Sequence, residues 1–238
     1  MPPEQTNELS KIDPVRTAFA DPGHVARYAE GPRHFVPGIE SLYRMTGVLL
    51  AERAPPDAHI LVLGAGGGLE LTALAQAYPG WTFTGVDPSA AMLRLAENTL
   101  GHLRSRVMLI EGLIDDAPTG PFDAAVCLLT LHFLDRDERI RTIREVHGRL
   151  RRDAPFVAAH SSFPQGEGER SQWLSRYCAY ALASGSSVEM TEKARAGVEA
   201  GLRLFSPEED AAMLRAGGFG NVTQFYTAFT WCGWVGYA

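Results

Sequence analysis

A buried strand that runs directly into a cluster of glycines constrains the fold of this chain more than any other feature. The stretch ILVLGAGGGLEL, residues 60–71, is aliphatic up to Leu63 and then carries four glycines within five positions. Apolar residues at helical spacing follow at once, so the glycines connect a strand to a helix. Glycine lets the backbone turn sharply and approach a ligand with no Cβ in the way. The free amides at the start of the helix can then face that ligand.

Asp87 is the second part of the predicted site. It ends the predicted strand WTFTGVD, residues 81–87, about twenty residues after the glycines. Because the carboxyl ends of parallel strands meet at one edge of a sheet, Asp87 and the glycines should lie close together, and a carboxylate there can accept both hydroxyls of a ribose. The pattern therefore predicts a nucleoside site. It argues against a nicotinamide dinucleotide, because Leu69 stands where the third glycine of that motif would fall.

Strand-like and helix-like segments alternate along the chain, which is typical of an α/β fold. The predicted strands are 59–63, 81–87, 107–112, 122–129, 154–161 and two within 218–237. Helices are predicted at 69–78, after Ser89, from Asp135 to about Arg152, and after the Ser206 capping box. We therefore expect a Rossmann-like, seven-stranded, mostly parallel sheet with helices on both faces. The last two strands should be antiparallel.

The predicted domain organisation is a core with helical additions. Residues 1–56 are expected to form an N-terminal helical cap, and residues 57–162 the nucleoside-binding core. A helical lid insertion is expected at 163–205, entered through the loose stretch FPQGEGERSQ. Residues 206–238 should complete the core with a helix and two antiparallel strands.

Composition narrows the class of function. The formal net charge of -6 argues against a nucleic-acid partner and favours a small-molecule substrate. The three cysteines, Cys127, Cys178 and Cys232, have no zinc spacing and fit a reducing, cytoplasmic location. The histidines show no metal-ligand spacing either, so no metal is expected. No apolar run approaches about 18 residues, so no membrane span is predicted.

Five segments in order resemble the class I S-adenosylmethionine-dependent methyltransferases: VLGAGGG, GVDPSAAMLRLA, FDAAVCLLTLHFL, LRRDAPFVAAH and AGGFGNV. The resemblance implies S-adenosyl-L-methionine as cofactor and S-adenosyl-L-homocysteine as product. By it, Asp87 would hold the ribose and the glycine loop would face the methionine part. The cofactor-binding positions it implies are Gly64, Ala65, Gly66, Asp87, Pro88, Met92, Gly112, Leu113 and Leu128.

Other segments are similar to the carboxy-S-adenosyl-L-methionine synthases. These are HVARYAEGPRHFVPGIESLYRMTGVLLAE, TLHFLDRDERIRTIREVHGRL and EMTEKARAGVEAGLRLFSPEE. In the last, Arg195 falls on that family's arginine for the extra carboxylate of its cofactor. The likeness implies prephenate as carboxyl donor, carboxy-S-adenosyl-L-methionine as a further cofactor, and a homodimer.

Four positions depart from that family. Where it has polar residues that touch the cofactor, this chain has Ile39, Val62, Gly112 and Leu128. Removing one polar interaction of this kind weakens binding by about 1–3 kcal/mol. We therefore predict methyl transfer to a small molecule, with carboxyl transfer and a non-catalytic binding protein as alternatives.

Methyl transfer needs mainly positioning of its reactants, and a general base only when the acceptor carries a proton. His132, just past the fourth strand, is the predicted base; the alternative is that it packs beneath the lid. Tyr28 and Arg33 are expected to meet the carboxylate of the cofactor. Arg195 and His160 are the predicted substrate-binding residues, although Arg195 also fits a solvated helix position and His160 a structural one.

Overall fold

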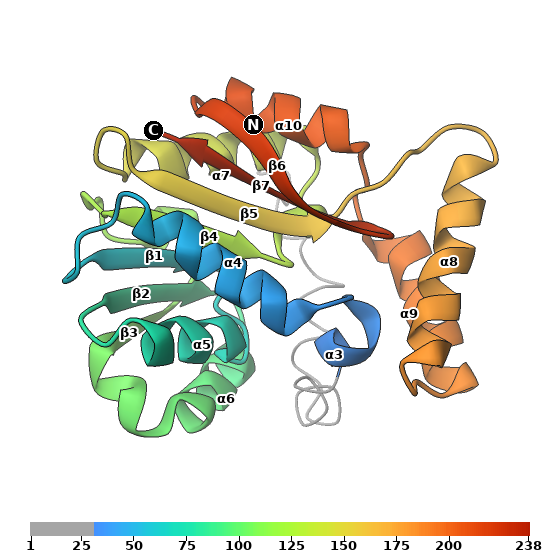
Figure 1. Ribbon diagram of the computed structural model, residues 1–238, viewed down its shortest axis with the longest axis horizontal. Helices are drawn as coiled ribbons and strands as arrows, with labels where there is room; N and C mark the ends of the chain where they lie inside the picture. The colour runs from blue at the N-terminus through green and yellow to red at the C-terminus, as the bar shows by residue number, and fades with distance from the viewer. Residues whose placement is uncertain (1–30) are drawn as a thin grey trace, which may run out of the picture.

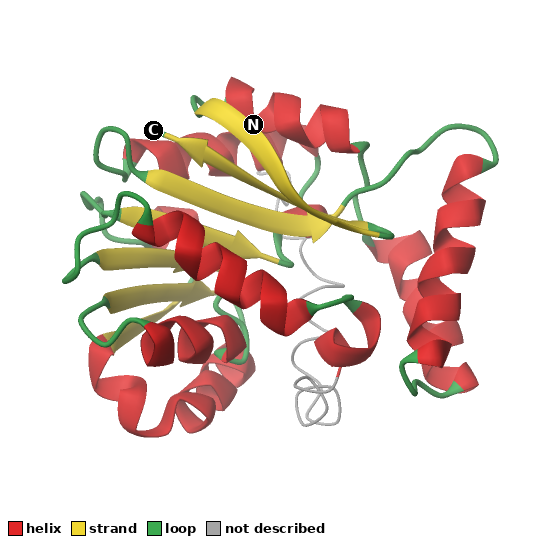
Figure 2. Ribbon diagram, viewed as in Figure 1, coloured by secondary structure: helices red, strands yellow, loops and turns green. Residues whose placement is uncertain are grey.

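The computed structural model describes residues 31–238, which form an α/β structure on one seven-stranded sheet (Figures 1 and 2). The strands are β1 (His59–Leu63), β2 (Thr82–Asp87), β3 (Val107–Glu111), β4 (Ala124–Leu128), β5 (Pro155–Ser161), β6 (Gly220–Ala228) and β7 (Trp231–Tyr237). The helices in this part of the chain are α3 (Gly31–Phe35), α4 (Ile39–Ala51), α5 (Leu69–Ala77), α6 (Ala90–Leu100), α7 (Arg136–Gly148), α8 (Glu169–Ala183), α9 (Val188–Gly201) and α10 (Pro207–Ala216). The predicted fold class is confirmed.

The strand order β3-β2-β1-β4-β5-β7-β6 locates the site. Strands β1 to β5 pair in parallel, whereas β7 runs antiparallel to both β5 and β6, as predicted. From β1 the chain moves outward to β2 and β3 and then returns to β4 on the other side. Ligands of open α/β sheets bind beyond the carboxyl ends of the strands at such a switch point. The ends of β1, β2 and β4 are therefore where a ligand is expected.

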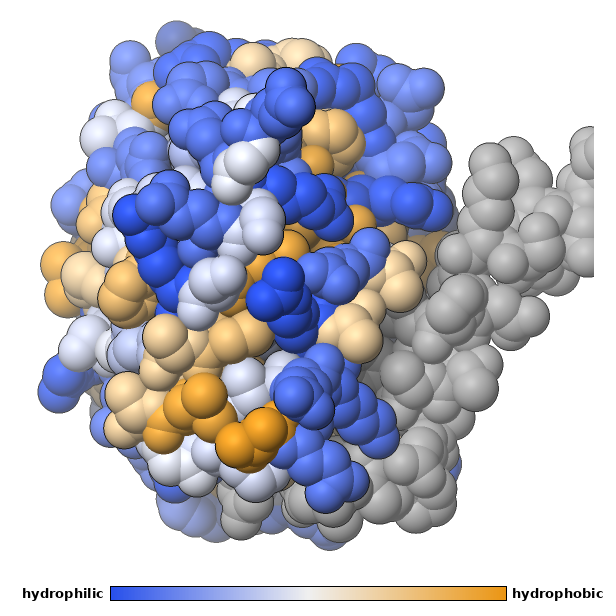
Figure 3. All heavy atoms as spheres, turned by 90° about the vertical axis from the view of Figure 1, so that its right-hand side faces the viewer, coloured by the Kyte–Doolittle hydropathy of each residue, from blue (hydrophilic) through white to orange (hydrophobic). Residues whose placement is uncertain are grey.

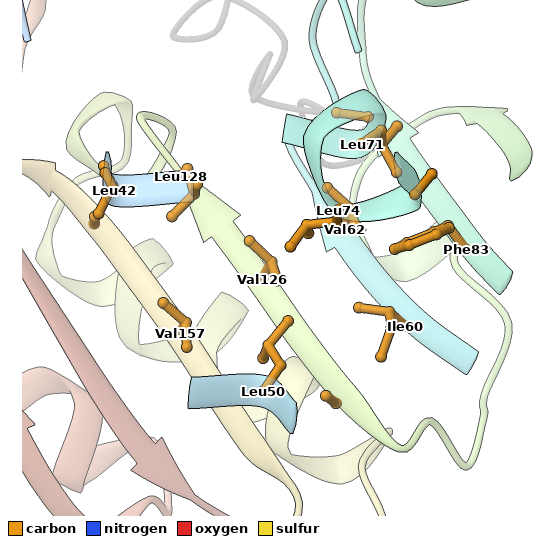
Figure 4. Packing of buried hydrophobic residues seen from close by; sticks show 14 of the residues in the cluster. Leu42, Leu50, Ile60, Val62, Leu71, Leu74, Phe83, Val126, Leu128 and Val157 are labelled. Atoms are coloured by element: carbon orange, nitrogen blue, oxygen red, sulfur yellow. The ribbon is translucent and has the colours of Figure 1, made fainter. Parts of the chain in front are cut away.

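One layer of helices covers each face of the sheet (Figure 1). Helices α4, α5 and α6 share an apolar cluster with the strand residues Ile60, Val62 and Phe83 (Figure 4). Helices α7 and α10 cover the opposite face through buried side chains such as Ile143 and Leu214. Strands β1, β2 and β4 lie inside the sheet and are covered on both faces, which is why their sequences are nearly continuous apolar runs.

Helix α4 belongs to this core and not to a separate cap. Leu42 and Leu50 are fully buried, and the helix lies against β4 and β5. The prediction that all of residues 1–56 form a cap is therefore corrected for residues 39–51, because an open sheet face needs the apolar side of this helix to cover it. Residues 1–30 lie outside the described part of the chain.

Two helix starts follow the predicted capping chemistry. The hydroxyl of Ser89 accepts the Met92 N–H at 3.3 Å and begins α6. At α10, Ser206 and Glu209 form a reciprocal capping box with Pro207 in the first turn.

Helix α7 is shorter than predicted, because it ends at Gly148 and not near Arg152. The Phe122 N–H donates to the Arg149 carbonyl at 2.8 Å, and the Arg151 N–H donates to the Phe122 carbonyl at 2.9 Å. These hydrogen bonds hold residues 149–151 beside the start of β4, and the helix therefore does not continue through them.

The predicted lid insertion forms a helical hairpin, α8 and α9, that stands beyond the carboxyl edge of the sheet (Figure 1). It is tied to α3: the Nδ1 of His34 donates to the Ser184 carbonyl at 2.8 Å, and the rings of Phe35 and Tyr177 stack at 5.3 Å. The hairpin presents apolar surface on its outer face (Figure 3). Its exposed apolar side chains are Leu182, Val188 and Met190. Within residues 31–238, no helix is both long and apolar enough to cross a membrane.

Candidate functional site

The glycine loop lies folded onto the end of β2, as the sequence pattern predicts. The N–H groups of Gly64 and Ala65 donate to the Val86 carbonyl at 2.8 and 3.0 Å. The N–H of Gly66 donates to Oδ2 of Asp87 at 2.9 Å. The loop, the end of β1 and the carboxylate of β2 are therefore one unit at the carboxyl edge of the sheet.

Asp87 is 9% exposed, and both of its carboxylate oxygens are oriented by backbone amides. Oδ2 accepts from Gly66, and Oδ1 accepts from the N–H of Ser89 at 2.9 Å. Burial raises the pKa of Asp87, while these two hydrogen bonds act in the opposite direction. Each oxygen has a further lone pair, so the carboxylate can still accept hydrogen bonds from a ligand.

The loop needs glycine at two positions for steric reasons. Gly64 has a φ of +77°, and a Cβ there would lie 2.0 Å from the hydroxyl of Thr130, beyond the end of β4. Gly68 has a φ of +80°, and its Cβ would lie 3.0 Å from the backbone of Ala96 in α6. The glycines therefore let the loop pass close to β4 on one side and α6 on the other.

The end of β3 is joined to this unit. The N–H of Gly112 donates to the backbone carbonyl of Asp87 at 3.1 Å, and a Cβ at Gly112 would lie 2.3 Å from a carboxylate oxygen of Asp116. That carboxylate accepts the Leu113 N–H at 2.8 Å. The predicted positions Gly112 and Leu113 thus border Asp87. Pro88 is half-buried, and Met92 is buried at the start of α6.

Val62 and Leu128 face the helix layer and not the polar edge. Both side chains lie in the apolar cluster, Val62 towards α5 and Leu128 beside Leu42 (Figure 4). They are 0% and 2% exposed. Of the residues predicted to line the cofactor, Leu128 therefore offers a ligand its backbone only, because its side chain packs in the core.

Glu70 is a candidate site residue that the sequence pattern does not reveal. It lies in the first turn of α5, is only 6% exposed, and its Oε1 has no hydrogen-bond partner within residues 31–238. Burial raises the pKa of Glu70 well above its ordinary value, and the Asp87 carboxylate adds to the rise. The one signal in the sequence is a charged residue next to Leu71, at the point where the helix begins to bury its apolar face.

His132 is buried in a short helical turn, Leu131–Phe133, after β4. Its Nδ1 accepts the Ser161 N–H at 3.0 Å, which leaves the ring proton on Nε2. Burial, with His160 and Arg139 nearby, lowers the pKa of His132 well below its ordinary value. The ring is therefore neutral, and a role as general base would require the proton to leave Nε2.

His160 lies in a different buried network. Its Nε2 is 3.1 Å from Oδ1 of Asp210, and the same oxygen accepts from Arg139. All three side chains are about 1% exposed and lie between β5, α7 and α10. The predicted substrate role of His160 does not fit this position, because the ring is enclosed on the sheet face opposite α4 and α5.

The predicted arginines lie at the surface. Arg33 is 3.7 Å from Glu40, with 71% of its side chain exposed. The Nε of Arg195 donates to Glu199 one turn along α9 at 3.0 Å. Within residues 31–238, neither guanidinium forms an ion pair with Asp87. Tyr28 falls outside the described residues.

Comparison with known proteins gives one consistent likeness. Residues 61–156 match the family model of a methyltransferase domain. The carboxy-S-adenosyl-L-methionine synthase of Chromohalobacter salexigens is 28% identical over 220 residues, which cover 90% of this chain and 81% of that protein.

Two solved structures share the fold. PigF with SAH gives a TM-score of 0.68 at 19% identity and covers 94% of this chain and 62% of PigF. An O-methyltransferase family protein from Burkholderia thailandensis gives a TM-score of 0.66 at 16% identity, over 92% of this chain and 61% of that protein. The chain thus spans less than two thirds of either protein.

Proposed function

We propose that this chain, which carries a methyltransferase domain in the fold of the S-adenosylmethionine-dependent methyltransferases, transfers a methyl group from that cofactor to a small molecule. The observation that carries the proposal is the Asp87 carboxylate, held at the end of β2 by the amides of Gly66 and Ser89. A carboxylate at this point of such a fold accepts the hydroxyls of a ribose.

The residues at the edge suit S-adenosyl-L-methionine. The glycines at 64 and 66 place no Cβ between the backbone and a ligand, so the methionine part would lie along this loop. Asp87 would hold the ribose, and Met92 with Leu113 would border the adenine. The unpartnered oxygen of Glu70 is a buried polar group in need of a ligand. The cofactor supplies an activated methyl group bound to a sulfonium.

The role of the protein is mainly to align the acceptor with that methyl group and to exclude water. The α8–α9 hairpin, beyond the carboxyl edge, would cover the acceptor. His132 is the candidate that handles a proton of the acceptor. Because the Ser161 N–H donates to Nδ1, the proton of the ring is on Nε2, and His132 can donate a hydrogen bond from Nε2. Nε2 could accept a proton only if its own proton first moved to Nδ1, which would break the hydrogen bond with Ser161.

Carboxyl transfer is the second candidate. The similarity to a carboxy-S-adenosyl-L-methionine synthase along most of this chain favours it. The apolar residues Ile39, Val62 and Leu128, all buried, weigh against it because they stand where the synthases bind the cofactor through polar side chains. A third candidate is a protein that binds the cofactor without catalysis.

Calorimetry with three ligands tests the proposal: S-adenosyl-L-methionine, S-adenosyl-L-homocysteine and carboxy-S-adenosyl-L-methionine. We expect the first two to bind. A marked preference for the carboxylated form, abolished in Arg195→Ala, would support carboxyl transfer instead. Binding of the first two ligands without methyl transfer to any of a panel of hydroxylated and amino small molecules would support the third candidate.

A homodimer and a cytoplasmic location belong to the same proposal. The homodimer follows from the resemblance to the synthases, and the cytoplasmic location from three free cysteines. Sedimentation of the purified chain across a range of concentrations tests the first.

A further inference from the structure

We propose that Glu70 binds the α-amino group of the cofactor's methionine part. The inference rests on the proposed function and adds to it a residue that positions the amino-acid end of the ligand.

The location of Glu70 is the first argument. Strand β1 lies between β2 and β4 in the sheet, and α5 begins directly after the glycine loop that leaves β1. The carboxyl of Glu70 interacts electrostatically with Asp87 at the end of β2 and with Cys127 near the end of β4. Glu70 is thus a buried residue in the first turn of the helix that follows the glycine loop, near the strand ends where the methionine part would lie.

The lack of partners is the second argument. Glu70 is only 6% exposed, and its Oε1 accepts no hydrogen bond from any described residue. A buried carboxyl normally has a hydrogen-bonded or charged partner, because its desolvation is otherwise costly. The described groups that act electrostatically with it, Asp87 and Cys127, are an acid and a thiol and bring no positive charge. Among residues 31–238 the carboxyl therefore has no cationic partner, and a bound ligand can supply one.

The chemistry of the ligand supplies that cation. The amino-acid end of S-adenosyl-L-methionine carries an ammonium, and a carboxylate is its natural partner through charge-assisted hydrogen bonds. Val62 is fully buried in the apolar cluster and has no polar side-chain atom to offer (Figure 4). Glu70 would therefore bind the ammonium from the helix that follows the loop.

The test compares two ligands that differ only at the amino-acid end. S-adenosyl-L-homocysteine carries the ammonium, whereas 5′-methylthioadenosine lacks the whole amino-acid part. We expect Glu70→Gln to weaken the affinity for S-adenosyl-L-homocysteine at least tenfold and to leave the affinity for 5′-methylthioadenosine unchanged. Glu97→Gln, on the exposed side of α6, is the matched control and should change neither affinity.

A second measurement does not depend on affinity. Burial raises the pKa of the Glu70 carboxyl in the unliganded protein, and a neighbouring ammonium would lower it, so binding of S-adenosyl-L-homocysteine should be coupled to release of a proton. Calorimetry in buffers of different ionisation enthalpy reports that proton, and Glu70→Gln should abolish the release. The unliganded Glu70→Gln protein should also melt at the same temperature as the wild type or higher.

Three results would overturn the inference. Equal affinity of wild type and Glu70→Gln for S-adenosyl-L-homocysteine would show that the carboxyl does not touch the ligand. Equal weakening of both ligands would mean that Glu70 only shapes the loop. Failure of the wild type to bind either ligand would overturn the proposed function itself, and is distinguishable because it appears before any substitution is made.

Discussion

Two buried groups of charged residues lie in this sheet on opposite faces, and they differ in whether their charges are matched. Arg139, Asp210 and His160 form a network between β5, α7 and α10 in which Oδ1 of the acid meets two basic side chains. Glu70 and Asp87, at the ends of β1 and β2, are two acids that form no ion pair with a basic side chain among the described residues. A buried acid with a basic partner is typical of a structural ion pair, whose loss from one side destabilises the fold. A buried acid without a basic partner, at a strand end, indicates a ligand site.

The two groups also differ in what they hold in place. Arg139 donates to the backbone carbonyls of Leu134 and Arg203, so it fixes the segment that returns from the α8–α9 hairpin to α10. Asp87 instead orders the glycine loop through one backbone amide and retains lone pairs for more. Substitutions in the two groups should therefore affect different measurements.

The largest effect is expected for Asp210→Asn. It leaves the buried guanidinium of Arg139 without its counter-charge, and breaking such a pair from one side costs about 3–5 kcal/mol. Urea unfolding measures this decrease in stability. Asp115→Asn, in the exposed pair with Arg141, is the control and should cost less than about 1 kcal/mol. Equal decreases in the two variants would show that the buried network is not an anchor.

Asp87→Asn should have the largest effect on binding. Hydrogen bonds to a charged group contribute about 1.5–3 kcal/mol, so removing the charge beneath two ribose hydroxyls should weaken S-adenosyl-L-homocysteine about 100-fold. Calorimetry measures the affinity. Asp123→Asn is the control, because Asp123 likewise accepts a backbone N–H, that of His59 at 2.8 Å, but lies at the opposite end of β1. An Asp87→Asn protein that binds like the wild type would remove the foundation of the proposed function.

Gly64→Ala should lower both the stability to urea and the affinity for the ligand, because Gly64 joins strand β1 of the core to the glycine loop. A positive φ at alanine and a clash with Thr130 together cost about 1–3 kcal/mol of unfolding free energy. Thr130→Ala in the Gly64→Ala background should recover part of this stability by making room for the Cβ. Gly148→Ala, where a Cβ meets nothing within 4 Å, is the control and should not destabilise the chain.

The two buried acids should give the stability opposite dependences on pH. Burial alone would raise the pKa of Asp210, but His160 and Arg139 outweigh it and hold the pKa below its ordinary 3.8. Its contribution is therefore present above that value and lost as the pH falls through the folded pKa. The pKa of Glu70 is raised above its ordinary 4.5, so stability is lost as the pH rises from 4.5 towards the folded pKa.

Urea unfolding of the unliganded proteins checks this contrast. The difference between Glu70→Gln and wild type should be small near pH 4 and grow in favour of Glu70→Gln towards neutral pH. The deficit of Asp210→Asn should persist at neutral pH and shrink only in strong acid. If Glu70→Gln were less stable than the wild type by the same free energy of unfolding at every pH, Glu70 would have a partner within the protein and would not await a ligand.

The contrast between the two groups also explains what the sequence could predict. Alternating strands and helices, the glycine loop and the cap at Ser89 are local patterns with local causes, and they led to the fold and to the neighbourhood of Gly66 and Asp87. The sequence leaves His160 between a substrate-binding and a structural role, because its position at the end of a strand does not show which side chains it will meet. The pairing with Asp210, far along the chain, decides between them.

Glu70 could not be recognised from the sequence for a related reason. An acid in the first turn of a helix is an ordinary and favourable feature, because it complements the helix dipole at the surface. Nothing local distinguishes a solvated acid there from one that is buried, as Glu70 is. That distinction depends on how β2 and β4 flank β1, which is a property of the assembled sheet.

Arg195→Ala should have the smallest effect and bears directly on the reaction. Its pair with Glu199 is an exposed interaction one turn along α9, worth about 0.3–0.5 kcal/mol, so unfolding should hardly change. Affinity for S-adenosyl-L-homocysteine should be the same as in the wild type, because the guanidinium is engaged on the hairpin and not at the sheet edge. Glu199→Gln, which frees the guanidinium without removing it, is the matched control. If Arg195→Ala selectively weakened the carboxylated cofactor while Glu199→Gln strengthened it, the hairpin would have to bring this arginine to the edge when ligand binds, and carboxyl transfer would then account for the chain better than methyl transfer.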